Sequence, residues 1–234
     1  MTKLTIIVPC FNEIKTIKIL IEQVLNLEKI DKQIIVVDDN SNDGSREIIK
    51  EFETKKEIDL VFHNSNFGKG ACIISAQKLV KGDIVVIQDA DLEYDPKDII
   101  NLIEPILKKD YLVVYGSRIL GKKYFENLKN FSHWIRILGN LFLTIFSNLI
   151  NRQNLTDAHT CYKVFDAELF KQINLREKNF NFCPEITTKI SNKGIKIYEL
   201  PITYMGRDYD QGKKIKFIDA FKAVHCIIKY KFFK

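Results

Sequence analysis

The first 118 residues alternate short apolar runs with segments of helical periodicity, and this alternation limits the folds open to the chain. Five runs have the length and composition of buried strands: LTIIVP (4–9), QIIVVDD (33–39), IDLVFH (58–63), DIVVIQD (83–89) and YLVVYGSR (111–118). The segments between them space their apolar residues three to four positions apart, as amphipathic helices do. Apolar strands that alternate with helices are typical of a parallel sheet covered on both faces. We therefore expect an α/β fold with a mostly parallel central sheet and helices on both faces.

The second half of the chain has a different pattern. Residues 131–150 are rich in aromatic side chains and long enough for one helix, either a core helix or a helix lying against lipid. Residues 195–204 resemble a strand, and Pro201 within it favours the edge of a sheet. No repeat, low-complexity tract or linker interrupts the chain. We therefore expect one domain over 1–234.

The net charge of +6 is concentrated in the last segment, which carries seven lysines against one aspartate from Lys213 onward. Phenylalanines and isoleucines lie between these lysines. The pattern fits either a solvated helix face or a surface for anionic lipid headgroups. No DNA- or RNA-binding motif accompanies the charge, so we expect no nucleic acid partner. The five cysteines are scattered without a CxxC pair, which favours a reducing compartment, and no signal peptide is recognisable at Met1.

Four carboxylates lie at and beyond the end of the fourth apolar run, in the segment IVVIQDADLEYD (84–95). Clustered acids repel one another, so a plain turn would more easily use Gly, Asn or Pro. Asp89 and Asp91 are two residues apart, and in an extended backbone their carboxylates point to the same side. Such oxygen ligands suit Mg²⁺ or Mn²⁺, which take one or two carboxylates together with substrate phosphates. Ligands of parallel α/β sheets bind beyond the carboxyl ends of the strands, so this is the candidate metal site, with Glu93 as a further ligand or a solvated turn acid.

Two further segments place polar groups at the same predicted edge. Asp38 and Asp39 end the second run, where carboxylates can bind a ribose or base N–H groups, or where Asp39 and Ser41 cap the next helix. FGKG (67–70) precedes a predicted helix whose N–H groups could meet phosphate. This segment matches neither the P-loop nor the dinucleotide-binding glycine pattern.

Seven motifs occur in an order that resembles a known family: IIVPCFNE (6–13), VVDDNSNDGS (36–45), NFGKGACI (66–73), IQDADLEYDP (87–96), VVYGSR (113–118), LTDAHTCYKVF (155–165) and YELPITYMGRDYDQGKKIKF (198–217). Together they resemble the family-two inverting glycosyltransferases of GT-A fold, and most closely the dolichyl- or polyprenyl-phosphate mannose and glucose synthases. The resemblance covers nearly the whole chain. It implies a nucleotide-sugar-binding half over 1–120 and an acceptor-facing half over 121–234.

The resemblance implies hexose transfer from a GDP-mannose or UDP-glucose type donor to a polyprenyl or dolichyl phosphate, with Mg²⁺ or Mn²⁺. The implied catalytic residues are Asp89, Asp91 and Arg118, and the implied metal ligands are Asp89, Asp91 and Glu93. The matching donor-binding positions are Pro9, Phe11, Glu13, Val37, Asp39, Ala90, Arg207, Lys213 and Lys214. The acceptor-side candidates are His133 and Asp157. The chain departs from the family pattern at Phe11, where Tyr is usual, at Glu93, where Gln or Ser is common, and at Cys161, Tyr162 and Lys163, which replace a small-Gly-Phe motif.

The chemistry of the acceptor separates the alternatives. A lipid phosphate is already ionised at pH 7 and needs no strong base, so the main tasks are neutralising the leaving diphosphate and aligning two anions. The resemblance then implies a cytoplasmic protein, peripheral at the cytoplasmic face of a membrane, with the membrane surface and a separate membrane protein as candidate partners. A glycosyltransferase that acts on a sugar of a surface polysaccharide or glycolipid would need a base, for which Asp157 is the candidate. A phosphoreceiver-like module and a nucleotide-sugar nucleotidyltransferase fit the motif order less well.

Overall fold

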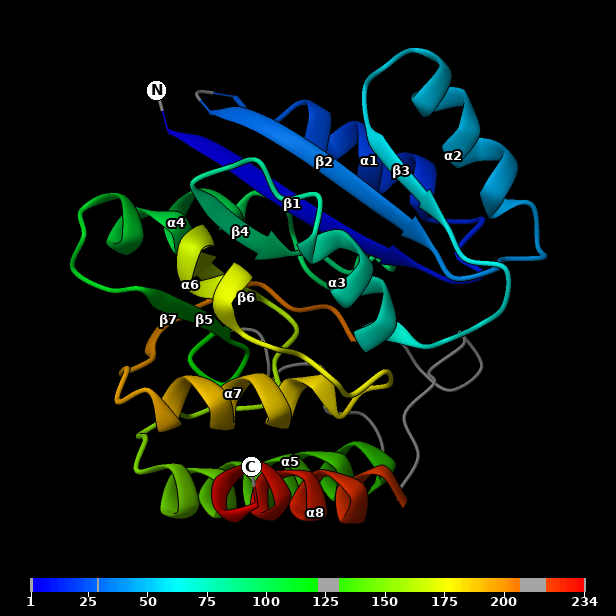
Figure 1. Ribbon diagram of the computed structural model, residues 1–234. Coiled ribbons are helices and arrows are strands. Elements are labelled where there is room, and N and C mark those ends of the chain that lie inside the picture. Colours follow the sequence, from blue (N-terminus) through cyan, green and yellow to red (C-terminus); the bar gives the residue numbers. More distant parts are fainter. Residues whose placement is uncertain (1, 29, 122–130, 207–217, 234) are drawn as a thin grey trace.

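The computed structural model describes residues 2–28, 30–121, 131–206 and 218–233, and these are built around one sheet (Figure 1). In the described part of the chain the sheet has seven strands in the order β3-β2-β1-β4-β6-β5-β7. Their bounds are β1 Lys3–Cys10, β2 Asp31–Asp38, β3 Asp59–Phe62, β4 Ile84–Ile87, β5 Val113–Ser117, β6 Lys163–Asp166 and β7 Tyr198–Pro201. The five strands expected in the first half are present, and β7 lies at the edge as Pro201 predicted. The α/β class is confirmed.

One strand was not expected. β6 pairs antiparallel with both β4 and β5, whereas the other neighbours in the sheet pair in parallel. β6 comes from the second half of the chain and separates two strands of the first half. The segments 1–120 and 121–234 therefore share one sheet.

Helices cover both faces of the sheet because alternate strand residues point to opposite sides. On one face, Leu4, Ile6 and Val8 of β1 belong to a core with α1 (Ile17–Leu25), α2 (Ser45–Thr54) and α4 (Asp98–Leu107). On the other, Ile7 and the β2 residues Ile35 and Val37 belong to a core with α3 (Lys69–Gln77), α6 (Ala167–Gln172) and α7 (Phe182–Asn192). Both cores consist mainly of buried aliphatic side chains, together with buried aromatic ones.

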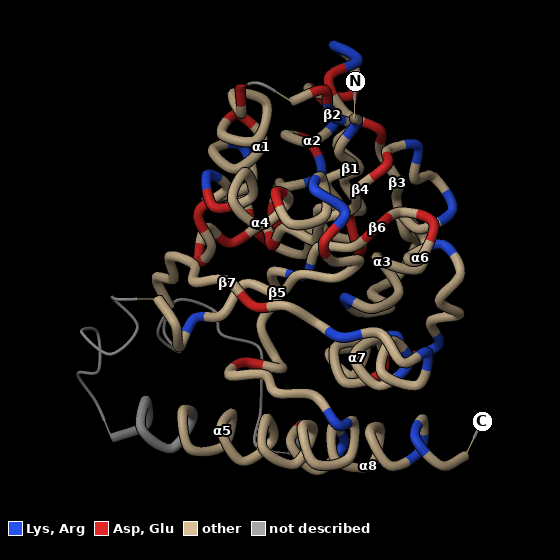
Figure 2. Tube along the Cα trace, turned by 90° about the vertical axis from the view of Figure 1, so that its left-hand side faces the viewer, with Lys and Arg blue, Asp and Glu red and all other residues tan. Residues whose placement is uncertain are grey.

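Two long helices form a further layer beyond α7, on the side away from the sheet (Figures 1 and 2). They are α5 (Phe131–Asn151) and α8 (Ile218–Phe232), which pack against each other and against α7. We call their exposed side the outer face, and its large apolar residues are Leu138, Leu141, Phe142, Ile145, Leu149, Phe221, Ile228 and Phe232. No helix within the described residues has the length and hydropathy needed to cross a membrane.

Candidate active site

A cavity of about 400 Å³ opens beyond the carboxyl ends of β1, β2 and β4, at the edge that the sequence predicted. Its lining includes nine of the predicted site residues: Pro9, Phe11, Glu13, Asp39, Asp89, Ala90, Asp91, Glu93 and Arg118. Val37 is instead fully buried under α3, and Asp157 is fully buried outside the lining. Arg207, Lys213 and Lys214 lie outside the described residues, as does the His133 side chain.

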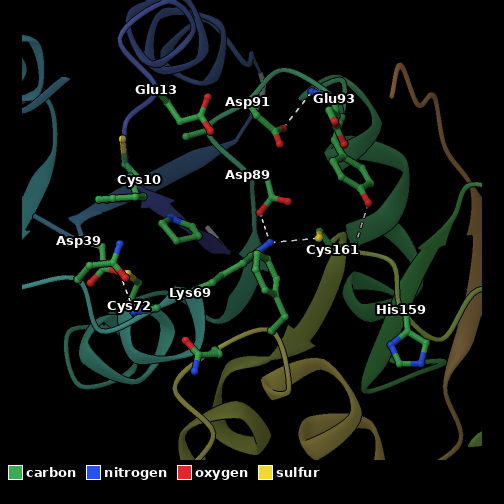
Figure 3. A pocket seen from close by; sticks show the side chains of 18 of the residues that line it. Cys10, Glu13, Asp39, Lys69, Cys72, Asp89, Asp91, Glu93, His159 and Cys161 are labelled. Carbon is green, nitrogen blue, oxygen red and sulfur yellow. Dashed lines mark hydrogen bonds and ion pairs between the residues drawn. The ribbon is translucent and has the colours of Figure 1, made fainter. Parts of the chain in front are cut away.

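The acidic segment after β4 turns sharply into the cavity. Leu92 has a positive φ of 60°, and the Glu93 amide donates to Asp91 Oδ1 at 3.1 Å, which fixes the turn. The Tyr204 hydroxyl donates to Glu93 Oε2 at 2.7 Å. Figure 3 shows the carboxylates of Glu13, Asp89, Asp91 and Glu93 gathered along one side of the cavity. The segment therefore presents several negative charges to the cavity.

These carboxylates fit a divalent cation whose coordination is completed by a ligand. Within the described residues, one set of three or more His, Cys or acidic side chains has all its ligand atoms within 4.8 Å of one another, and its members are Asp39, His63 and Cys72. Asp89, Asp91 and Glu93 therefore do not form a closed cage. Mg²⁺ and Mn²⁺ need no closed cage, because substrate phosphates and water supply the remaining ligands. Asp89 and Asp91 would hold the cation.

Asp39 joins the end of β2 to the FGKG segment. Its Oδ1 accepts from the Phe67 amide at 2.9 Å and its Oδ2 from the Gly68 amide at 2.7 Å. The same Oδ1 is 2.7 Å from His63 Nδ1. Asp39 therefore does not cap α2, whose N-cap residue Gly44 makes no side-chain cap bond. Asp39 therefore fixes the FGKG segment at one end of the cavity and also lines that cavity.

The loop after β2 also positions the loop after β1. Ser41 Oγ accepts from the Asn12 amide and Ser45 Oγ from the Glu13 amide, each at 2.9 Å. The serines of NSNDGS thus fix the backbone of the FNE segment, which carries Phe11 and Glu13 into the lining.

Arg118 and Asp157 bind each other. Arg118 Nε and Nη2 donate to the two Asp157 oxygens at 2.7 and 2.8 Å, and the Arg118 amide donates to Oδ2 at 3.1 Å. Burial raises the pKa of Asp157, but the Arg118 charge and hydrogen bonds from Arg118 and Asn140 outweigh it and lower the pKa to about 2. Arg118 still lines the cavity, whereas Asp157 is a buried carboxylate that is ionised at neutral pH. This placement does not fit Asp157 as an accessible base.

The sequence reasoning overlooked Lys69, the lysine of FGKG. It begins α3, and its ammonium donates to Asp89 and to Cys161 Sγ, the latter at 3.1 Å (Figure 3). The only sequence signal is a lysine between two glycines at a predicted helix start, where the expected phosphate contacts come from backbone N–H groups. The Lys69 ammonium therefore contacts the carboxylate of Asp89, a predicted metal ligand.

Two of the residues that depart from the family pattern, Tyr162 and Lys163, are buried, whereas Phe11, Glu93 and Cys161 line the cavity. Lys163 is fully buried, donates to the Ala158 carbonyl at 3.1 Å and lies 3.7 Å from the Tyr115 ring centroid, so it closes the loop before β6. The Tyr162 hydroxyl donates to Gln88 and to the Asp95 carbonyl.

His159 lines the cavity, and burial together with the Lys163 charge lowers its pKa to about 4. Its Nε2 is buried with no hydrogen-bond partner among the described residues.

Comparison with known proteins places this geometry in a family. The sequence profile of Glycosyl transferase family 2 matches residues 5–173. An uncharacterised protein of Methanocaldococcus jannaschii is 30% identical over 97% of this chain and 92% of its own length. The UDP-N-acetylglucosamine–dolichyl-phosphate N-acetylglucosaminyltransferase of Methanococcus voltae is 28% identical over 97% of this chain and 95% of its own length.

Solved structures show the same fold at low sequence identity. The glucosyl-3-phosphoglycerate synthase of Mycobacterium tuberculosis, in complex with Mn²⁺, UDP and glucosyl-3-phosphoglycerate, superimposes with a TM-score of 0.67 at 14% identity, over 98% of this chain and 80% of that one. No disulfide joins the five cysteines, all of which lie in the described part of the chain. With its seven motifs in order and its acidic pocket at the carboxyl edge of the sheet, the chain belongs to glycosyl transferase family 2 and has the GT-A fold.

Proposed function

We propose that this protein transfers a hexose, with inversion, from a nucleotide-sugar donor of the GDP-mannose or UDP-glucose type to a polyprenyl or dolichyl phosphate. The observation that carries the proposal is the pair Asp89 and Asp91 beside Asp39 in one cavity at the carboxyl edge of the sheet. The name of the Methanococcus voltae relative couples a UDP-sugar to dolichyl phosphate, and the solved neighbour contains UDP with Mn²⁺. Both support a nucleotide-sugar donor and a divalent cation here.

Different parts of the cavity would bind different parts of the donor. Pro9, Phe11, Glu13 and Asp39 lie at the end where β1 and β2 stop, and we assign the nucleoside to this end. The donor diphosphate would then lie at Asp89 and Asp91. When bound there, Mg²⁺ or Mn²⁺ supplies the positive charge that neutralises the leaving diphosphate.

The state of Asp157 favours a phosphate acceptor over a sugar hydroxyl. A hydroxyl acceptor needs a base within hydrogen-bond reach, and Asp157 is buried and bound to Arg118. A lipid phosphate attacks as an anion and needs no such base. The partly buried His159 lies on the cavity wall, where a phosphate could accept a hydrogen bond from it.

Helix α5 supports attachment to a membrane because it buries polar side chains and exposes apolar ones. Its polar residues Thr144, Ser147 and Asn151 are buried, at 1–3% exposure. Its apolar residues Phe142, at 62%, and Leu149, at 76%, face outward. A helix of a water-soluble protein normally buries its apolar side, so this outer face suits a lipid environment. We propose that the acceptor-facing half docks on the cytoplasmic face of a membrane, whose anionic lipids suit the lysines of α8 (Figure 2).

A transfer assay tests the proposal. The full chain with Mn²⁺ is given radiolabelled UDP-glucose, UDP-N-acetylglucosamine or GDP-mannose together with polyprenyl phosphate in detergent, and label is counted in the organic phase. We expect one donor to label the lipid, no transfer to unphosphorylated polyprenol, and loss of transfer with EDTA. Asp91→Asn should lower the rate by roughly 100-fold without unfolding the protein. Label that enters a water-soluble sugar and not the lipid would favour the polysaccharide alternative.

A further inference from the structure

The cavity contains a positive group that contacts one of the proposed metal ligands. Among the described residues of its lining, five are carboxylates: Glu13, Asp39, Asp89, Asp91 and Glu93. Two carry a permanent positive charge, Lys69 and Arg118. Arg118 is bound to Asp157, outside the lining. Lys69 is therefore the lining cation that is paired with one of the proposed metal ligands.

The backbone holds Lys69 firmly in this position. Gly68 has a φ of +98°, which other residues rarely adopt. At Gly70 an added Cβ would lie 2.1 Å from the Glu177 carbonyl oxygen, and the Ala71 amide donates to the Lys178 carbonyl at 2.9 Å. The two glycines thus fit the start of α3 tightly beneath the loop 177–179.

The Lys69 side chain is enclosed as well. It is only 12% exposed, and its ammonium reaches both Asp89 and Cys161 while lying 5.8 Å from the Phe182 ring centroid. A surface lysine samples many rotamers, whereas this one is confined to the cavity wall. The surrounding structure therefore holds its contact with Asp89 in place.

We propose that Lys69 is a resident counter-ion, which neutralises Asp89 in the ligand-free enzyme and transfers to the donor diphosphate when a divalent cation binds Asp89. An ammonium and a divalent cation on the same carboxylate repel each other, so Lys69 weakens the binding of metal alone. The diphosphate gives the displaced ammonium a new anionic partner. Metal and diphosphate then each strengthen the binding of the other. The inference rests on the proposed donor site and concerns how that site is filled.

The test compares Mn²⁺ binding with and without a nucleoside diphosphate. Free Mn²⁺ is measured by electron paramagnetic resonance in titrations of wild type, Lys69→Met and Lys69→Arg. Lys78→Met is the matched control, because Lys78 is exposed at the opposite end of α3. We expect Lys69→Met to bind Mn²⁺ alone roughly tenfold more tightly, because removing the competing charge leaves Asp89 available. Lys69→Arg keeps the charge and should retain the weak affinity.

Calorimetry with UDP or GDP, whichever wild type binds, gives the second readout. At saturating Mn²⁺ we expect Lys69→Met to bind the diphosphate roughly tenfold more weakly, since one charge-assisted contact is lost, and to bind the bare nucleoside unchanged. Opposite shifts for metal and diphosphate distinguish a counter-ion from a structural lysine. Lys69→Gln, which keeps a donor toward Asp89, replaces Lys69→Met if the latter does not fold.

The outcomes separate the two proposals. Wild type that binds Mn²⁺ and a nucleoside diphosphate, while a folded Lys69→Met matches Lys78→Met in both titrations, would overturn the counter-ion role and leave the proposed function intact. Wild type that binds neither ligand would overturn both.

Discussion

Arg118 and Asp157 form an enclosed ion pair beside the cavity, with side chains 15% and 0% exposed. A buried pair contributes little compared with an apolar replacement, but breaking it leaves an uncompensated charge. We expect Asp157→Asn to lower the free energy of unfolding by about 3–5 kcal/mol, measured by urea denaturation at pH 7. Glu104→Gln breaks the solvent-exposed pair with Lys108 and should have a far smaller effect, because water and salt screen that pair. Equal effects of the two substitutions would contradict the burial argument.

His159 gives the stability a defined dependence on pH. Its pKa is lowered to about 4, below the ordinary value of 6.5. As the pH falls below 6.5, the unfolded chain takes up this proton before the folded one, so stability decreases until about pH 4. The side chain is partly exposed, so we expect a loss of at most about 2 kcal/mol.

Urea denaturation of wild type and His159→Gln at pH 7 and pH 5 isolates this contribution. Wild type should lose more stability between the two pH values than the variant does. Parallel losses would show that His159 titrates alike in both states.

Single residues differ in how far the sequence could predict them. Asp39, Asp89 and Asp91 follow predicted strands, and parallel strands bring their carboxyl ends to one edge, so their meeting was foreseeable. Cys161, which Lys69 contacts, and Asp157, which Arg118 binds, lie in the loop before β6, and tertiary packing positions this loop. No local pattern shows that Arg118 meets Asp157.

At the scale of elements, β6 shows why the sheet order was not predictable. KVFD has four residues and begins with Lys163. The charge of this lysine predicts an exposed position, but the side chain is fully buried. Its antiparallel pairing depends on open edges of β4 and β5 that are distant in sequence. The strands of the first half were predictable because each is a continuous apolar run followed by a turn.

The FGKG segment and α5 provide a matched pair of glycines. Gly70→Ala would bring a methyl group onto the Glu177 carbonyl, whereas an added Cβ at Gly139 meets nothing within 4 Å. We expect Gly70→Ala to lower the melting temperature by several degrees, equivalent to about 1–3 kcal/mol. Gly139→Ala should stabilise the protein by about 0.5–1 kcal/mol, because alanine favours the helix. Differential scanning calorimetry measures both, and a stabilising Gly70→Ala would refute the close fit.

At the scale of the molecule, the proposed membrane attachment predicts that the outer face is the side that approaches lipid. Deleting 217–234 would test this poorly, because Ala223, Cys226 and Ile227 of α8 are buried against the rest of the protein. Lys222 and Lys229 also form ion pairs with Asp219 and Glu177, which reduces the charge offered to lipid. We therefore expect the apolar side chains to dominate binding.

Co-sedimentation with anionic vesicles measures this binding. Replacing Phe142, Ile145 and Leu149 by Gln should abolish pelleting, whereas Ile19→Gln with Ile100→Gln, exposed on α1 and α4, should leave it unchanged. About 0.5 M salt should weaken but not abolish pelleting, because salt screens only the charged part. Unchanged pelleting of the triple variant would contradict the outer face as the docking site. Pelleting only with a membrane protein extract would favour a protein partner.

The position of β6 also sets the order in which the chain matures during synthesis. β5 has no hydrogen-bonded neighbour in the sheet until Lys163–Asp166 and Tyr198–Pro201 have left the ribosome, whereas β1 to β4 can pair as they emerge. Limited proteolysis of a 1–120 fragment should therefore cleave within 111–120 and spare β1 to β4, and a fully resistant fragment would argue otherwise. Arg118 follows β5 directly, so this wall of the cavity is completed late. A prematurely terminated chain would contain every acid of the site and still lack a finished active site.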